Sequence, residues 1–198
     1  MADKKTIRDE APPPHDEGQF AAVCVDVIDL GFNVEKYQDQ PAELKDKTAL
    51  VFQTENAEGE DKPRYIAQEF ATSMGKKSNL RKFLEAWRGK PYTEDEARKQ
   101  GIPLDKLEGV PCLVTVAHKT SLKGNLHAVI QSIMPLPKQM REAVPSAASY
   151  KRPEFWEKKK TEYAAAVAEY TAKNTKASKA TDVNEFDESP DDTDDLPF

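Results

Sequence analysis

The sequence has few cysteines that could form disulfides and no long apolar run that could enter a membrane. It has two cysteines among 198 residues, Cys24 and Cys112, and both lie in apolar stretches typical of strands. The sequence therefore predicts buried, reduced thiols and no disulfide framework. No apolar run is long enough to cross a membrane, and the charged first residues lack the apolar core of a secretion signal. These absences predict a cytoplasmic protein with no membrane partner.

Motifs that carry catalysis are also missing. The chain has no glycine-rich phosphate loop and no lysine-centred nucleotide motif. Cys112 and His118 are six residues apart, about 20 Å along an extended strand, which is too far for two ligands of one zinc ion. Asp26 and Asp29 differ in strand parity, so they do not line one face as the carboxylates of a two-metal nuclease would. We therefore predict that the protein is not an enzyme and holds no metal and no cofactor.

Charge is divided unevenly along the chain. The net charge is −6, yet residues 20–149 are neutral overall and residues 150–181 carry a net charge of +4. Residues 182–198 contain eight acidic residues and no lysine or arginine. Without this segment the chain is net positive, so its acidic total does not argue against a nucleic-acid partner.

The acidic segment has two chemical parts. Four aspartates precede an apolar group stiffened by proline and ended by an aromatic residue. The apolar side chains of this segment can enter a small pocket on a partner protein, and its aspartates and carboxylate can bind a basic rim around that pocket. The alternative is a tail that only keeps the chain in solution. We predict partner binding by Asp191, Asp192, Asp194, Asp195, Leu196, Pro197 and Phe198.

Composition divides the chain into four parts. Residues 1–18 predict a disordered lead stiffened by three prolines, and residues 19–149 predict one ordered domain. Residues 150–181 predict a lysine-rich helix and linker, which either docks on the domain or stands away from it. Residues 182–198 repel themselves and have too little apolar surface to fold, so we predict a disordered acidic tail.

Hydrophobic periodicity predicts a mainly β protein with helical insertions. The apolar positions of one segment, 79–88, recur at helical spacing between a capping Ser78 and Gly89. A second helix follows Pro153. The order of three strands, a helix and two strands is that of the OB-fold, a five-stranded Greek-key barrel that binds oligonucleotides. The predicted strands are 20–30, 47–54, 63–70, 110–119 and 125–133.

Binding of single strands without sequence preference requires exposed rings and a basic groove. Tyr65 is expected to be exposed if its neighbour Ile66 is buried, whereas Phe52 and Phe70 fit core packing at least as well as stacking on bases. Six basic residues against one acid between positions 76 and 90 fit either a phosphate-binding surface or a solvated helix face. The candidate DNA-binding residues are Phe52, Lys62, Arg64, Tyr65, Phe70, Lys76, Lys77, Arg81, Lys82, Arg88, Lys90, Lys119 and Lys123.

The whole pattern resembles the bacterial and phage single-stranded DNA-binding proteins. The bacterial tail ends in aspartates followed by Ile-Pro-Phe, which Asp194-Asp195-Leu196-Pro197-Phe198 matches with leucine for isoleucine. Residues 79–93 and 109–114 also look like a set of phage replication-associated proteins. The body resemblance covers about residues 20–137.

The resemblance implies coating of single-stranded DNA during replication, recombination and repair. It also implies a tail that recruits replication or recombination proteins and that competes with DNA for the basic groove. If a bacteriophage encodes the chain, the protein is expected in the cytoplasm of the bacterial host. The insertion from Thr72 to Gly109 and the helix after Pro153 depart from the bacterial family, so a homo-oligomer is left open and its tetramer is not assumed. Two alternatives remain: a replisome adaptor that does not bind DNA, and a metal-dependent nuclease.

Overall fold

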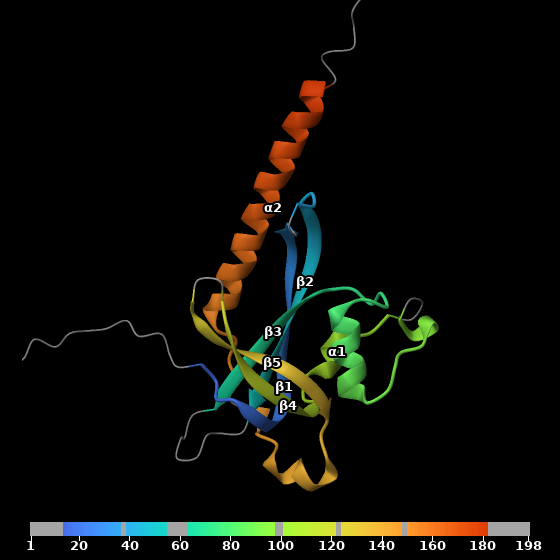
Figure 1. Ribbon diagram of the computed structural model, residues 1–198, viewed down its shortest axis with the longest axis vertical. Helices are drawn as coiled ribbons and strands as arrows, with labels where there is room; N and C mark the ends of the chain where they lie inside the picture. The colour runs from blue at the N-terminus through green and yellow to red at the C-terminus, as the bar shows by residue number, and fades with distance from the viewer. Residues whose placement is uncertain are drawn as a thin grey trace, which may run out of the picture.

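The computed structural model describes residues 14–36, 39–54, 63–97, 101–121, 124–147 and 150–181. These residues form a mainly β structure with one helix beside the sheet and a long C-terminal helix (Figure 1). In these ranges no helix has both the length and the apolar character needed to span a membrane.

Five antiparallel strands form one sheet in the order β3-β2-β1-β4-β5. We predicted a closed barrel, but the structure shows an open sheet. Among the described residues no ladder of hydrogen bonds joins the edge strands β3 and β5, and the two strands are only in contact. All five predicted strands are present, with the ends shifted by up to five residues. Their bounds are β1 Gly18–Glu35, β2 Glu43–Thr54, β3 Arg64–Ala71, β4 Pro111–Thr120 and β5 Leu126–Pro135.

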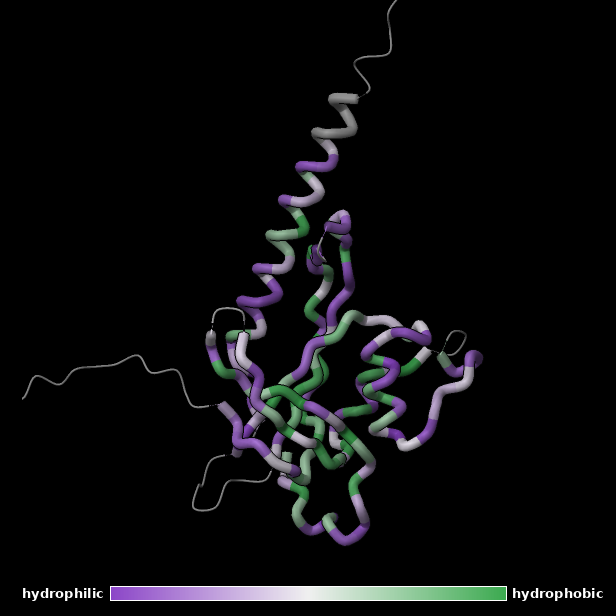
Figure 2. Tube along the Cα trace, viewed as in Figure 1, coloured by the Kyte–Doolittle hydropathy of each residue, from purple (hydrophilic) through white to green (hydrophobic). Residues whose placement is uncertain are grey.

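The long first strand serves both halves of the sheet. Residues 18–23 pair with β4, and residues 22–35 pair with β2. A register shift between Asp29 and Gly31, where Gly31 has φ 71°, gives the bulge that this glycine allows. Beyond this bulge β1 and β2 extend as a hairpin arm whose far end is polar (Figure 2).

The main core lies between the inner face of the sheet and α1 (Asn79–Arg88). The helix begins and ends as its sequence predicts: Ser78 Oγ accepts a hydrogen bond from Arg81 N, and Gly89 adopts the left-handed conformation with φ 73°. Its apolar face meets strand residues that alternate toward the interior. The largest buried side chains here include Leu50, Phe52, Leu80, Leu84, Val114 and Val116.

A second apolar cluster lies on the outer face of the sheet. Ile28 and Val51 belong to it, and Trp156 at the start of α2 (Glu154–Thr181) covers them. Tyr150 and Tyr163 pack against the same cluster. The lysine-rich segment therefore docks on the domain, and α2 runs along the hairpin arm until Tyr170, whose hydroxyl donates to Ala42 O at 2.7 Å. Short 3₁₀ helices, η2 (Leu104–Leu107) and η3 (Lys138–Ala143), complete the described elements.

Candidate nucleic-acid interface

Two of the three aromatic candidates lie in the core. Phe52 is fully buried, and its ring contacts Trp87 at 5.3 Å between centroids. Phe70 is also buried, with its ring 4.8 Å from that of Phe83. The prediction that Phe52 and Phe70 stack on bases is therefore wrong for this structure, because both point to the inner face of β2 and β3 and pack under α1.

Arg81 is a structural residue and not a surface cation. Its side chain is buried and donates to Glu85 Oε1 at 2.9 Å, to Glu94 Oε1 at 3.2 Å and to the carbonyl oxygens of Met74 and Tyr92. The hydrogen bond from Arg81 lowers the pKa of Glu85. These contacts tie α1 to the loops on both sides of it, which leaves no free donor edge for a phosphate.

Arg88 is also engaged within its own segment. Its Nη2 donates to Glu96 Oε1 at 2.7 Å, and its guanidinium lies 4.6 Å from the centre of the Tyr92 ring. This hydrogen bond, with those from Thr93, lowers the pKa of Glu96 to about 2. Thr93 and Glu96 form a capping box, with Thr93 N donating to Glu96 at 2.8 Å and Glu96 N donating to Thr93 at 3.2 Å.

The lysines of the same segment remain exposed. Lys76 pairs with Glu94 at 3.7 Å, whereas Lys77, Lys82 and Lys90 have no ion pair within the described part of the chain. Lys82 lines a groove of about 970 Å³ between α1, β3, β5 and the polar ends of β1 and β2. That groove is not cationic, because its lysines are matched by carboxylates, namely Glu35, Glu43, Asp46 and Glu69.

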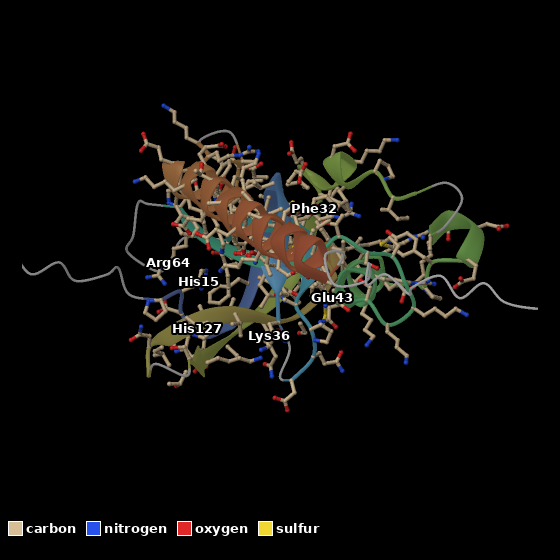
Figure 3. All side chains as sticks on the ribbon, turned by 90° about the horizontal axis from the view of Figure 1, so that it is seen from above. His15, Phe32, Lys36, Glu43, Arg64 and His127 are labelled. Carbon is tan, nitrogen blue, oxygen red and sulfur yellow. The ribbon has the colours of Figure 1, made fainter. Side chains whose placement is uncertain are left out.

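Tyr65 is the predicted aromatic residue that reaches the surface. Ile66 is buried as expected, and Tyr65 is 39% exposed on the outer face of β3. Its ring makes an edge contact with Tyr150, with 5.3 Å between centroids. At the start of β3, Arg64 pairs with Asp16 at 2.6 Å, close to His15 (Figure 3).

The C-terminal segment is fastened beside Tyr65 by a buried carboxylate. Asp26 Oδ1 accepts from Arg152 Nη2 at 2.6 Å, and its Oδ2 accepts from Arg152 Nε at 2.8 Å and from the Tyr150 hydroxyl at 2.9 Å. Burial and the hydrogen bond to Asp26 raise the pKa of Tyr150. Tyr150 is therefore held neutral, with its ring against the sheet.

A second carboxylate fixes α2 against β3. Glu69 accepts from Lys159 Nζ, and from the Tyr163 hydroxyl at 2.8 Å. Phe155 lies one turn before Lys159 on the same flank of the helix, and the Lys159 ammonium is 5.5 Å from the centre of the Phe155 ring. Lys159 therefore lies against β3, and Phe155, which is 58% exposed, packs its ring 5.2 Å from that of Trp156.

These residues make a candidate surface, which we call the aromatic face. It joins the outer side of β3 to the start of α2, and a shallow pocket of about 130 Å³ lies between Tyr65, Tyr150 and Lys151. Lys151 and Lys158 are exposed, and neither forms an ion pair among the described residues. The aromatic face consists of Tyr65, Tyr150, Lys151, Phe155 and Lys158.

Sequence reasoning found Tyr65 and missed the other four residues. Residues 150–160 interleave three aromatic and five basic residues, which is the signal for a nucleic-acid surface. The net charge of the segment can be read from the sequence, but its docking on the sheet depends on Trp156 and on the distant partners Asp26 and Glu69.

The remaining candidates lie elsewhere. Lys119 is exposed near the end of β4. Lys62, Lys123 and the seven tail residues from Asp191 to Phe198 lie outside the described residues. No family model matches the chain, no curated protein is significantly similar to it, and no solved structure is significantly similar to its fold.

Proposed function

We propose that the protein binds single-stranded DNA without sequence preference and protects it during replication, recombination or repair. The observation that carries this proposal is the aromatic face, where the exposed Tyr65 ring contacts Tyr150 beside Lys151. The start of α2 adds the exposed side chains of Phe155 and Lys158. Rings of this kind stack on any base, and lysines attract the backbone without reading sequence.

The fold supports the same function. A strand order of β3-β2-β1-β4-β5, with β3 and β5 in contact and a helix between β3 and β4, is compatible with an OB-like arrangement. OB-folds bind oligonucleotides on the outer side of their second and third strands. In this protein Tyr65 lies on the outer face of β3 and contacts Tyr150, and the C-terminal segment supplies the other rings and the cations of the aromatic face.

The acidic segment supports a second part of the proposal, the recruitment of replication or recombination proteins in the host cytoplasm. Its aspartates and its Leu196-Pro197-Phe198 group suit a pocket with a basic rim. Deleting residues 182–198 is expected to leave or raise DNA affinity and to abolish this recruitment. A fall in DNA affinity after the deletion would contradict this separation of roles.

The direct test is a titration of labelled oligo-dT with the full chain at two salt concentrations. Tyr65→Ala and Phe155→Ala are each expected to weaken binding by about 1–3 kcal/mol, the contribution of one stacked base. Phe32→Ala is the matched control, because Phe32 is equally exposed but lies on the hairpin arm (Figure 3).

Three results would overturn the proposal. Absence of oligo-dT binding by the wild-type chain at low salt would favour an adaptor that contacts only proteins. Degradation of the oligonucleotide in the presence of magnesium would favour a nuclease. Equal losses for Phe32→Ala and for the two variants of the aromatic face would place the DNA elsewhere.

A further inference from the structure

An apolar pocket outside the aromatic face has no part in DNA binding as proposed. It has a volume of about 720 Å³ and lies between the end of α1, the start of β4, the end of β5 and η3. It shares no residue with the aromatic face. Its walls are mainly apolar and include Leu84, Trp87, Leu107, Val110, Pro111 and Leu136.

Two arginines line the pocket and offer donors for an anionic group. Arg88 Nη1 is buried and has no hydrogen-bond partner among the described residues, while its Nη2 donates to Glu96. Arg141 of η3 is exposed and has no ion pair in the part of the chain that the structure describes. A buried donor without an acceptor is costly, and a ligand with an anionic oxygen would satisfy it. The pocket therefore suits a ligand that is both apolar and acidic.

We infer that this pocket binds residues 191–198 of a second copy of the chain. The aspartates of that segment complement Arg88 and Arg141, and its Leu196-Pro197-Phe198 group complements the apolar walls. Proline restricts the backbone of the group, which lowers the entropy lost on binding.

The reach of the segment favours a second copy over the same molecule. The 28-residue helix α2 is about 42 Å long, and it runs away from the end of the domain where η3 lies (Figure 1). The 15 residues from 182 to 196 span at most about 50 Å when fully extended. To reach the pocket of its own molecule, the segment would first have to run back along the whole length of α2. That path would use nearly all of its reach before it crossed the domain.

Such a contact joins two different surfaces and links protomers head to tail. A link of this type does not close on itself unless a ring forms, so it produces chains of protomers. The tail contact does not use the aromatic face, because the pocket shares no residue with it. The link itself does not depend on DNA binding.

Sedimentation velocity of the full chain over a range of concentrations provides the test. The wild-type chain is expected to associate, and Arg141→Glu is expected to weaken association at least about tenfold, the loss that follows removal of an interface charge pair. Lys138→Glu is the matched control, since Lys138 is an exposed cation of the same η3 and does not line the pocket. Leu196→Ala combined with Phe198→Ala is expected to weaken association as much as Arg141→Glu does.

Mixing the two defective chains separates this inference from misfolding and from docking within one molecule. The Arg141→Glu chain keeps an intact tail and the Leu196→Ala/Phe198→Ala chain keeps an intact pocket, so their mixture is expected to form 1:1 dimers and nothing larger. A wild-type chain that stays monomeric, normal association by either variant, or a mixture without dimers would overturn the inference. Oligo-dT binding by the same variants is a separate measurement, so its failure would count only against the proposed function.

Discussion

Two basic segments of this protein have similar composition and different uses. In residues 76–90 the arginines pair with nearby carboxylates, Arg81 with Glu85 and Glu94 and Arg88 with Glu96, and they lie away from the aromatic face. In residues 150–160 one arginine and one lysine hold the segment on the sheet, and Lys151, Phe155 and Lys158 remain exposed. A run of positive charge therefore shows where cations are, and the distribution of carboxylates in space decides which of them remain available.

The docking of residues 150–160 is expected to depend most on Trp156. Trp156→Ala should lower the free energy of unfolding by about 3–5 kcal/mol, because it removes a buried ring from the cluster with Ile28 and Val51. Urea unfolding measures the loss. Phe155→Ala, at the exposed neighbour, should stay within about 0.5 kcal/mol of the wild type. Equal stability of Trp156→Ala and the wild type would mean that the segment is not docked.

The structural character of the first segment can be tested at the end of α1. Gly89→Ala should destabilise the protein by about 1–3 kcal/mol, since residue 89 has φ 73° and an added Cβ would lie 2.9 Å from Pro135 Cγ. Gly75→Ala is the control, because the nearest atom would be 3.6 Å away and its φ is not in the left-handed range. Thermal or urea unfolding measures the stability of both variants. A loss of stability for Gly75→Ala as large as that for Gly89→Ala would contradict the structural role of Gly89.

Charge reversal compares the two segments directly in DNA binding. Lys151→Glu with Lys158→Glu should weaken oligo-dT binding at least about tenfold at low salt and reduce the salt dependence of binding. Lys77→Glu with Lys82→Glu should change the affinity by less than about threefold, because Lys82 lines a groove rich in carboxylates and Lys77 is not part of the aromatic face. A reversed order of effects would return the binding surface to α1.

The smallest effect is expected from pH. The pKa of Glu96 is lowered to about 2 by Arg88 and Thr93, and that of Glu85 is lowered by Arg81. A lowered pKa in the folded state gives stability that is complete above the ordinary carboxyl pKa of about 4.5 and is lost as pH falls toward 2. Urea unfolding at pH 5 and pH 3 should therefore show a smaller loss for Glu96→Gln than for the wild type. An identical loss would mean that Glu96 does not contribute.

Local sequence patterns were enough for the secondary structure. The helix over 79–88 appears with both of its caps, and all five strands are found, because capping residues and apolar periodicity act over a few neighbouring residues. The buried thiols of Cys24 and Cys112 were also predicted, and burial raises the pKa of Cys24 to about 12.

The candidate site was only partly predictable. Side chains alternate along β3, so a buried Ile66 was enough to assign its neighbour Tyr65 to the surface. The burial of Phe52 and Phe70 could not be decided in this way, because it depends on which face of the sheet α1 covers. The failure at Arg81 has a similar cause, since its partner Glu94 lies 13 residues away across a loop.

The sequence by itself determined the elements of this protein and the uneven division of its charge, because both are properties of neighbouring residues. Only the tertiary structure decided that the sheet stays open between β3 and β5 and that residues 150–170 lie on its outer face. The contacts responsible join residues about 90 to 130 positions apart, such as Asp26 with Arg152 and Glu69 with Tyr163. No periodicity in the chain specifies such pairs; they form because burying Trp156 and pairing two carboxylates on one face stabilise a single arrangement.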